Sequence, residues 1–424
     1  MSIWDRKKPS FGFVSTRFAG TDGVSLETEK WAEVLNEKGC SAYFMAGKLD
    51  TDPEVSHLAP KTFFHHEEIL EVQHALFTEK RRSRQVSQKI HALKEEIRDE
   101  IEEFYQRFGF DILVVQNALA IPVNIPFGLA LAEFIAESEI PTIAHHHDFY
   151  WERQRFHSFA AMEYFRWAFP PFQPHIQHVV INSIAGEELA RRTGASWTLI
   201  PNIMDFKLLP QGVDEYNLDF RSEIGLDDDH LLVLQPTRVV SRKGIETSIE
   251  LVHRLAHPKS SLVITHESGD EGFAYQRRVE EYAGFMGVDL KIIPDRISKD
   301  RGRREDGLKQ YTLWDAYSHT DLVTYPSLYE GYGNAFVEAI FFRKPVVVNR
   351  YPIFEVDIET KGFDAVVFDS FISQETIEEV RQLLKDSDRL AEMAETNYML
   401  GWRYLSYEML EEKLEMLLVN IYGS

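Results

Sequence analysis

Two glutamates bracket a short stretch that could bind a phosphorylated sugar. In "YPSLYEGYGNAFVEAI", residues 325–340, Glu330 and Glu338 stand with seven residues between them, and Gly331 and Gly333 lie inside the pair. The stretch follows an expected strand, "DLVTYPS", and leads into an expected helix, "AFVEAIFFRK". Glycines leave room for a ligand beside the backbone, and a helix N-terminus offers N–H groups and a positive dipole end to phosphate. A carboxylate in the first turns, Glu338, can accept hydrogen bonds from the cis diol of a ribose.

The glutamate pair also has a purely structural interpretation. Acidic residues near a helix N-terminus are stabilised by the helix dipole alone, with no ligand. The bare spacing is weak evidence, because two glutamates so spaced occur by chance in most proteins. The agreement of strand, glycines and helix is what favours a ligand site.

A second stretch supplies positive charge. "QPTRVVSRKGIETSIEL" places Arg238 and Lys243 between an expected strand and an expected helix, with Gly244 beside the lysine. Two cations at such a turn could neutralise a diphosphate and stabilise it as a leaving group. The alternative is surface charge on a loop.

Three consecutive histidines end another expected strand, in "AHHHDF", residues 144–149. Three histidines could suggest a metal site, but neighbours on a strand point to opposite faces, so one ion cannot easily bind all three. We therefore predict no metal here. We expect one functional histidine at the strand end, His147, and structural packing is the alternative.

The elements that must position these residues form two α/β halves joined near residues 203–228. Strands alternate with helices, and the strands are apolar throughout, as a parallel sheet covered on both faces requires. Residues ~64 to 108 read as a charged helical segment. Its basic cluster at 80–84 is interpreted as a solvated face rather than a membrane-touching patch. Residues 397–422 are predicted to form one long helix.

Composition limits the classes of function. The 424 residues carry a formal net charge of -22, which argues against a nucleic-acid or anionic-membrane binder. Hydrophobic residues make up 44 %, enough for sizeable cores, and the one cysteine, Cys40, excludes an intramolecular disulfide. No secretory signal and no apolar run long enough to span a membrane is visible. We expect a cytoplasmic protein without stable membrane association.

These stretches resemble glycosyltransferase family 4, retaining enzymes of the GT-B fold. The pattern "EGFG", apolar residues and "EA" of that family reads "EGYGNAFVEA" here, and its "GRL…KG" reads "PTRVVSRKG". Its interdomain "IPNGVD" reads "IPNIMD", and its "GG" loop reads "GTDGVS", with Asp22 in place of one glycine. "FVSTRFAGTDGVSLE" together with "HHHDFYWERQRF" also resembles, more weakly, bacterial enzymes that make mannosylglucosylglycerate.

The resemblance implies a fold and its domains. It implies two Rossmann-like α/β domains facing a central cleft: residues 1–205 on the acceptor side and 206–395 for the nucleotide-sugar. A C-terminal helix, ~396–424, is expected to cross back onto the first domain.

The resemblance also implies a role for each matching residue. Arg238 and Lys243 would bind the donor diphosphate, Glu338 the ribose, and Glu330 and His147 the donor sugar. The remaining donor-binding residues are expected to be Gly23, Ile297, Gly331, Tyr332, Gly333, Asn334 and Ala335, with Ile293–Ile297 lining the base pocket.

The implied activity is hexose transfer from a nucleotide-sugar, of the GDP-mannose or UDP-glucose type, with retained anomeric configuration. The resemblance implies that no cofactor or metal is required. It also implies that the leaving phosphate oxygen takes the acceptor's proton, so no strong protein base is needed. The acceptor is expected to be a small hydroxyl compound, glucosylglycerate among them. Asn117 could bind a sugar hydroxyl, and Arg153 and Arg155 could bind a carboxylate. Surface arginines are the alternative.

Other functions fit the same architecture. A sugar-nucleotide epimerase would release nucleotide without an acceptor, and a glycogen-type phosphorylase would need a pyridoxal-phosphate lysine region that is not visible. The third alternative is a non-catalytic scaffold protein that binds a nucleotide-sugar. Intact Arg238, Lys243, Glu330 and Glu338 argue against it. A homodimer is left open.

Overall fold

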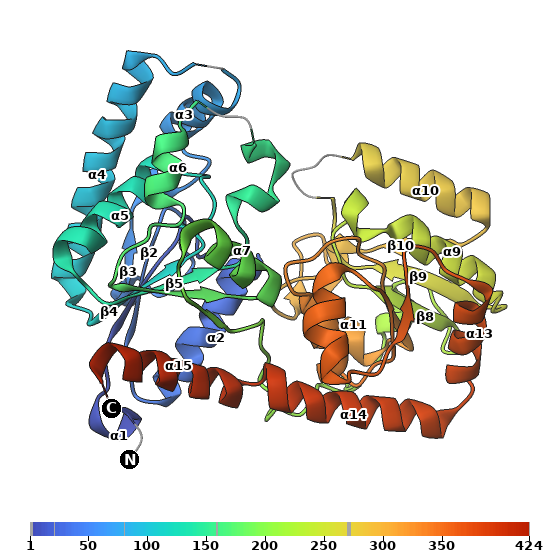
Figure 1. Ribbon diagram of the computed structural model, residues 1–424. Helices are drawn as coiled ribbons and strands as arrows, with labels where there is room; N and C mark the ends of the chain where they lie inside the picture. Colours follow the sequence, from blue (N-terminus) through green and yellow to red (C-terminus); the bar gives the residue numbers. More distant parts are fainter. Residues whose placement is uncertain (1–2, 21, 80, 158–159, 269–272, 424) are drawn as a thin grey trace. The chain divides into compact units, whose positions relative to one another are not determined.

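The computed structural model describes residues 3–20, 22–79, 81–157, 160–268 and 273–423. The chain divides into two compact units (Figure 1). One unit is Met1–Ile203 together with Tyr407–Ser424, and the other is Met204–Ser406. Each unit is built on an open parallel β-sheet with helices on its faces, so the α/β class expected from the sequence is confirmed.

The sheet of the first unit has seven strands in the order β3-β2-β1-β4-β5-β6-β7. All neighbours are parallel, and β1 pairs with both β2 and β4. The winding reverses between β1 and β4, and ligands bind open α/β sheets beside the carboxyl ends of strands at such a point. The strands are β1 (Phe11–Val14), β2 (Ala42–Ala46), β3 (Ser56–Leu58), β4 (Ile112–Gln116), β5 (Thr142–His146), β6 (Ile176–Val180) and β7 (Trp197–Leu199).

Apolar residues cover both faces of this sheet. Along β4, Leu113 and Val115 join the core that contains α3–α6, whereas Ile112 and Val114 join the core that contains α2 and α15. The strand is therefore buried on both sides, which explains why its sequence does not alternate. The helices are α2 (Gly23–Glu37), α3 (Glu67–Phe77), α4 (Arg84–Phe108), α5 (Ile125–Ser138), α6 (Met162–Ala168), α7 (Ser183–Thr193) and α15 (Tyr407–Tyr422).

The charged segment ~64 to 108 forms two helices rather than one. α3 ends at Phe77, and α4 begins after Ser83, whose side chain accepts a hydrogen bond from the Val86 amide. α4 ends at Gly109, which adopts a left-handed conformation. Its buried stripe recurs at helical spacing and holds the helix on the sheet: Ile90, Leu93, Ile97, Ile101 and Phe104.

The expected single C-terminal helix is also two helices, which corrects that prediction. α14 (Ser387–Leu405) belongs to the second unit, and Ser406, in extended conformation, separates it from α15 in the first. α15 buries its leucines in the core that also holds Trp31 and Leu35 of α2. The Tyr407 hydroxyl donates to Glu33 Oε2 at 2.6 Å. α15 therefore packs within the first unit, and α14 belongs to the second (Figure 1).

The second unit has a six-stranded parallel sheet in the order β10-β9-β8-β13-β14-β15. β8 pairs with both β9 and β13, so the winding reverses between β8 and β13. The strands are β8 (Leu231–Gln235), β9 (Ser260–Ile264), β10 (Asp289–Ile292), β13 (Leu322–Tyr325), β14 (Val346–Asn349) and β15 (Val366–Phe368). The helices include α9 (Ile245–Leu255), α10 (Ala274–Met286), α11 (Leu313–Ser318), α12 (Asn334–Phe341) and α13 (Gln374–Leu383).

Candidate active site

A buried ion cluster stands where the winding of the second sheet reverses. Lys243 ends a short 3-10 helix after β8, and Glu330 lies in the loop after β13. Lys243 is 8 % exposed and Glu330 is 7 % exposed. The Lys243 ammonium donates to the Glu330 carboxylate, and Arg242 donates to Glu330 Oε2 at 3.2 Å. The two predicted residues are thus brought together, and Arg242, which the sequence analysis did not single out, joins them.

This cluster holds an ionised carboxylate between two cations. Burial alone would raise the pKa of Glu330, but the charges of Lys243 and then Arg242 outweigh burial and hold that pKa below its ordinary value. One negative charge therefore faces two positive charges, so the cluster carries a net positive charge. Such a cluster can attract an anion such as a diphosphate.

Two glycines allow close approaches of the loop after β13, one to the loop after β8 and the other to Tyr351, which follows β14. Gly244 follows Lys243 with φ +62°, and a Cβ there would lie 2.4 Å from the Pro326 carbonyl oxygen. Gly333 has φ +126°, and a Cβ there would lie 2.6 Å from the Tyr351 hydroxyl. Any side chain at either position would clash and would also strain the backbone.

The glycine loop leads directly into α12, as the sequence predicted. Gly333 precedes the first helical residue, Asn334, and caps the helix without a side chain. Tyr332 is buried, and the Tyr351 hydroxyl donates to its carbonyl at 2.7 Å. Gly331, Tyr332, Gly333, Asn334 and Ala335 thus form one turn whose backbone leads to a helix N-terminus, a geometry suited to phosphate.

Glu338 lies on α12, where a tyrosine fixes its carboxylate. The hydroxyl of Tyr317, on α11, donates to Glu338 Oε2 at 3.0 Å and lies 3.1 Å from the carbonyl oxygen of Ala335. Glu338 is half-buried, whereas Tyr317 is fully buried. Tyr317 was not predicted from the sequence.

Arg238 is exposed and follows β8, and the neighbouring strand adds a histidine beside it. The Val239 amide donates to the Glu267 carbonyl at 3.3 Å, which joins the loops after β8 and β9. His266 precedes Glu267, and its Nδ1 lies 2.8 Å from Thr265 Oγ1. Burial, followed by the charges of Lys243 and Arg238, lowers the pKa of His266 to about 4. His266, also missed by the sequence analysis, is therefore a neutral hydrogen-bonding group beside two cations at pH 7.

The expected base pocket lies after the edge strand of this sheet. Ile293 is buried and follows β10, and the half-buried Ile297 forms an isolated bridge with Tyr311. β10 is separated from β8 by β9, so these residues stand at the same edge as the ion cluster but two strands away. Among the described residues, no hydrogen bond or ion pair joins Ile293 or Ile297 to the ion cluster.

The arginine-rich segment 298–307 is anchored to its own unit. Arg301 donates to the fully buried carboxylate of Asp315 and to Asp214. Residues 302–303 and 309–310 pair as the antiparallel strands β11 (Gly302–Arg303) and β12 (Lys309–Gln310). The segment is thus a hairpin braced by Arg301, and residues 303–307 at its tip are exposed, as expected of a solvated loop.

In the first unit, the three histidines alternate across β5 as the strand geometry predicted. His145 stacks on Trp31 at 4.5 Å between ring centroids and lies 4.4 Å from the ring of His147. His146 points to the other face, where its Nε2 lies 2.9 Å from His178 Nδ1. The three imidazoles therefore do not converge on one point.

His147 is held at the strand end by two neighbours. Its amide donates to Asn117 Oδ1 at 3.0 Å, and its Nε2 lies 3.2 Å from Gln116 Oε1. Burial lowers the pKa of His147 to about 4, although Asp148 and Asp22 oppose the shift. The ring is therefore neutral at pH 7 and can hydrogen-bond to an uncharged hydroxyl.

The three residues predicted to bind the acceptor are placed differently. Asn117, with φ +60°, donates to Asp148 Oδ1 at 2.8 Å, so its amide group organises the loop that carries His147. Arg153 pairs with Asp148 at 2.5 Å and remains half-exposed. Arg155 lies over the Phe156 ring, beside a cavity of about 430 Å³ lined by α3 residues and Phe156.

Gly23 is the first residue of α2, after the loop that follows β1. Asp22, which replaces a family glycine, caps this helix by accepting from the Val24 amide at 3.2 Å and pairs with Arg17 at 3.1 Å. Gly23 itself is exposed. Asp22 thus has a structural role, because its side chain caps the helix at a position where the family has a glycine.

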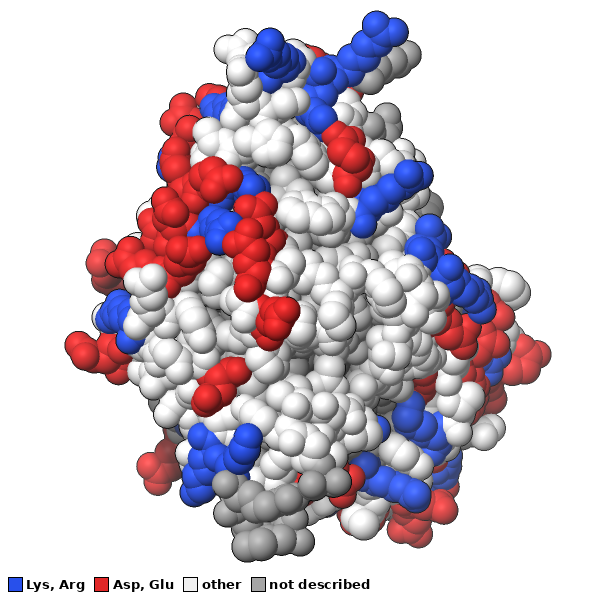
Figure 2. All heavy atoms as spheres, turned by 60° about the vertical axis from the view of Figure 1, so that its left-hand side comes forward, with Lys and Arg blue, Asp and Glu red and all other residues white. Residues whose placement is uncertain are grey.

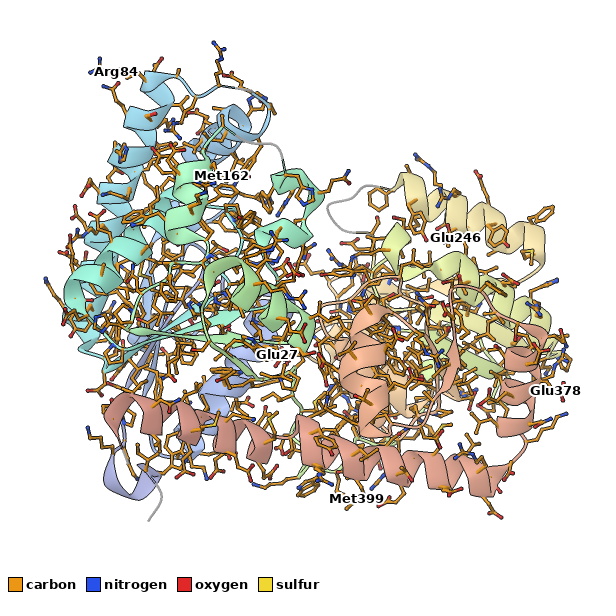
Figure 3. All side chains as sticks on the ribbon, viewed as in Figure 1. Glu27, Arg84, Met162, Glu246, Glu378 and Met399 are labelled. Atoms are coloured by element: carbon orange, nitrogen blue, oxygen red, sulfur yellow. The ribbon has the colours of Figure 1, made fainter. Side chains whose placement is uncertain are left out.

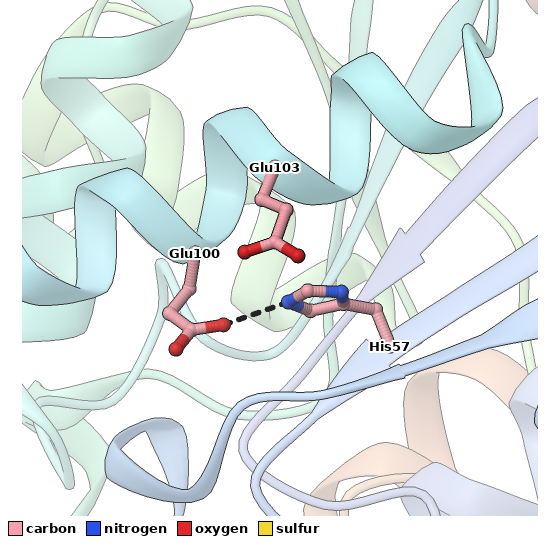
Figure 4. Close-up of side chains that lie close together, drawn as sticks. All are labelled: His57, Glu100 and Glu103. Atoms are coloured by element: carbon pink, nitrogen blue, oxygen red, sulfur yellow. Dashed lines mark hydrogen bonds and ion pairs between the residues drawn. The ribbon is translucent and has the colours of Figure 1, made fainter.

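Two groups of side chains in the described part of the chain could hold a metal ion, and neither includes residues 145–147. In the first (Figure 4), His57 of β3 lies 2.7 Å from Glu100 on α4, and Glu103 stands one turn along the same helix. β3 is the edge strand, four positions from β5. The second group is Asp227, Asp229 and His230, and Lys259 forms an ion pair with each of the two aspartates.

In the basic cluster at 80–84, Arg82 contacts neighbouring residues, whereas Arg81 and Arg84 are exposed. Arg82 donates to Glu163 and lies 4.5 Å over the Tyr164 ring, while Arg84 begins α4 (Figure 3). Lys80 lies outside the described residues. Acidic and basic side chains are intermixed on the face drawn in Figure 2, without a continuous basic field. None of the described helices is long and apolar enough to cross a membrane.

Comparison with known proteins shows that the chain is similar to glycosyltransferases. Residues 307–399 match the family model described as glycosyl transferases group 1. The chain is 31 % identical to a mannosylglucosylglycerate synthase of Petrotoga mobilis over 84 % of this chain and 85 % of that one. It is 30 % identical to the synthase of that name from Thermotoga maritima over 93 % and 96 %.

Among solved structures, the fold is similar to that of HepE of Anabaena in complex with UDP and glucose. The TM-score is 0.64 at 13 % identity, over 97 % of this chain and 99 % of that one. At this identity the likeness concerns the fold alone, and it identifies the two parallel-sheet units as those of the GT-B architecture.

Proposed function

Because the chain belongs to the family of group 1 glycosyltransferases that includes the mannosylglucosylglycerate synthases, we propose that it moves a hexose from a nucleotide-sugar to a small hydroxyl acceptor. The donor is of the GDP-mannose or UDP-glucose type. The names of the two relatives make glucosylglycerate the first acceptor to test, with mannosylglucosylglycerate as the product.

The observation that carries this proposal is the cluster of Lys243, Arg242 and Glu330 beside the turn at Gly333. In a nucleotide-sugar, a diphosphate connects the ribose of the nucleoside to the hexose. The cations and the first turn of α12 suit the diphosphate, and Glu338 suits the ribose diol. Arg238 and His266 add a charged and a neutral donor at the same strand ends.

The reaction we propose retains the anomeric configuration. The bond between the anomeric carbon and the phosphate oxygen breaks, and the acceptor oxygen forms its bond on the same face. The acceptor proton passes to the departing phosphate oxygen, so no protein carboxylate has to act as a strong base. Lys243, Arg242 and Arg238 stabilise the charge that develops on the diphosphate, which is the usual source of electrostatic catalysis. We propose that this proceeds without a bound metal.

Two groups on the first unit complete the proposal. Neutral His147 is the candidate hydrogen-bonding group for the transferred sugar, held in place by Asn117 and Gln116. Arg153 and Arg155 are the candidates for the carboxylate of a glycerate acceptor, since a guanidinium binds a carboxylate in a bidentate fashion.

The experiment that tests donor binding is a calorimetric and thermal-shift panel of UDP, GDP, ADP and their hexose conjugates. A ligand that binds only the folded protein raises its melting temperature. We expect one base to stabilise the protein clearly above the other two. If none binds at millimolar concentration, the donor site proposed here does not exist.

A further inference from the structure

Tyr317 is buried in the second unit and contacts the candidate ribose ligand. It lies on α11, whose start is fixed by Thr312 and Asp315 in a reciprocal capping arrangement. None of its surface is exposed. Its ring stacks on Phe342, with centroids 4.9 Å apart and planes within 3°. The ring therefore has one well-defined position.

The hydroxyl of Tyr317 bridges two parts of α12. It lies 3.0 Å from Glu338 Oε2 and 3.1 Å from the Ala335 carbonyl oxygen, so its single proton is shared between a side chain and the first turn of the helix. Burial, and then the Glu338 charge, raise the pKa of Tyr317 far above its ordinary value. The phenol is therefore protonated at pH 7 and acts as a hydrogen-bond donor.

A glutamate side chain has three rotatable bonds, and an unrestrained carboxylate would be spread over several rotamers. Ordering a long side chain costs entropy each time a ligand binds, and a group that is already ordered avoids that cost. A hydrogen bond from a fixed phenol orders the carboxylate before the nucleotide arrives. A carboxylate accepts several hydrogen bonds, so the bond to Tyr317 still allows Glu338 to accept from a ribose.

We propose that Tyr317 is a positioning residue that orients Glu338 and so gives the site its preference for ribonucleotides over 2′-deoxyribonucleotides. The inference rests on the proposed function, in which Glu338 receives the ribose hydroxyls. It assigns the selectivity for the 2′-hydroxyl to a pair of residues on α11 and α12 rather than to Glu338 alone.

The test compares Tyr317→Phe with the wild type and with Glu338→Gln. The probe is the diphosphate, UDP, GDP or ADP, that stabilises the protein best, together with its 2′-deoxy counterpart, and calorimetry gives a Kd for each. Tyr317→Phe keeps the ring and removes only the hydroxyl. We expect it to weaken ribonucleotide binding about 5- to 10-fold, because the glutamate side chain would then have to be ordered when the ligand binds. The deoxy form should lose much less, so that the ratio of the two Kd values shrinks.

Tyr311→Phe is the matched control. Tyr311 is also fully buried in the second unit, and its hydroxyl donates to a carboxylate, that of Asp219, at 2.8 Å. Its loss should cost comparable stability without changing the ratio of the two Kd values. A purely structural role for Tyr317 would make the two tyrosine variants behave alike.

The outcomes separate this inference from the proposed function. If Glu338→Gln abolishes the ribose preference and Tyr317→Phe leaves it intact, the positioning role is wrong and the donor site stands. If Glu338→Gln leaves the preference intact, the ribose role of Glu338 itself is wrong. Should Tyr317→Phe fail to fold, Phe342→Leu keeps the hydroxyl and removes the stacking partner. It should also lower the preference, and an unchanged preference would overturn the inference.

Discussion

The pairing of Lys243 with Glu330 changes how each residue is understood. Sequence reasoning assigned the lysine to the diphosphate and the glutamate to the sugar. The structure joins them in a buried ion pair with Arg242 alongside. Removing one member of a buried pair leaves an uncompensated charge, so effects on stability and on catalysis have to be measured separately.

Replacing Lys243 with Met should cut turnover by about 10²- to 10³-fold, the usual effect of losing one group that stabilises a developing negative charge. It should also lower the melting temperature, because the buried Glu330 loses one of its two cationic partners and keeps the partly exposed Arg242. The double variant Lys243→Met, Glu330→Gln removes both charges. Its melting temperature should recover while its turnover stays low. A near-normal rate in the single variant would rule out a role for Lys243 in stabilising the leaving group.

The residues that the sequence could not reveal are those with no motif of their own. Tyr317 stands 21 residues before Glu338, and only the packing of α11 on α12 brings them together. His266 reaches Arg238 because β9 lies beside β8. Glu330 and Glu338, in contrast, were identifiable, since strand, glycines and helix are consecutive in the chain.

At the scale of elements, the tight turn after Lys243 is the feature most sensitive to substitution. Gly244→Ala should be strongly destabilising, because its Cβ would lie 2.4 Å from the Pro326 oxygen. Gly287 has a similar φ, +67°, but open space around it. Gly287→Ala should cost only the backbone strain, about 1 to 2 kcal/mol. Denaturant unfolding of both variants measures the difference, and equal losses would show that the approach of the two loops is not tight.

The strands β5 and β6 make the first unit sensitive to acid. Burial lowers the pKa of His147 and His178 to about 4, and it holds those of His145 and His146 well below the ordinary value of 6.5. The folded state keeps these rings neutral, whereas the unfolded chain takes up protons below pH 6.5. Stability is therefore present above pH 6.5 and is lost as the pH falls from there toward 4.

The expected slope is up to about 1.4 kcal/mol per pH unit for each neutral histidine. Calorimetric unfolding between pH 7.5 and 5.0 should show a falling melting temperature. The double variant His146→Phe, His178→Leu should flatten the fall, and His257→Asn, at an exposed position, should not. A melting temperature independent of pH over this range would contradict the account.

The sequence predicted most strands and helices on either side of the two winding reversals, because apolar runs and helix caps are local signals. It did not predict the break at Ser406, since the helical pattern of "WRYLSYEML" continues through that residue. The break coincides with the boundary between the two units, a long-range feature that no local pattern encodes. The short strands β3 and β15 were also missed, although β7, of the same length, was predicted from its apolar run.

At the scale of the whole molecule, an acidic chain places three cations at the strand ends where the donor would bind. A net charge of -22 repels a free diphosphate, so the local field of Lys243, Arg242 and Arg238 has to overcome it. The salt concentration should therefore affect nucleotide binding, because dissolved ions screen the charges of these three residues. The same local charge removes the need for a bound divalent ion in the proposed reaction.

Treatment with a chelator should leave the rate of sugar transfer unchanged, because the proposed site meets the diphosphate with side chains. The check is an assay with and without EDTA, followed by addition of Mg²⁺ or Mn²⁺. A loss of activity that either ion restores would show that metal-independent transfer is wrong. Glu103→Gln would then test whether the group of His57, Glu100 and Glu103 holds that ion.

The most direct test of the central claim is sugar transfer itself. Purified protein is mixed with glucosylglycerate and either GDP-mannose or UDP-glucose, and the product is analysed by mass spectrometry and by NMR at the anomeric carbon. We predict one added hexose, retained configuration, and release of nucleoside diphosphate that depends on the acceptor. Nucleotide release at the same rate without acceptor, or no reaction with any nucleotide-sugar and hydroxyl acceptor, would contradict the assignment of this chain as a hexosyltransferase.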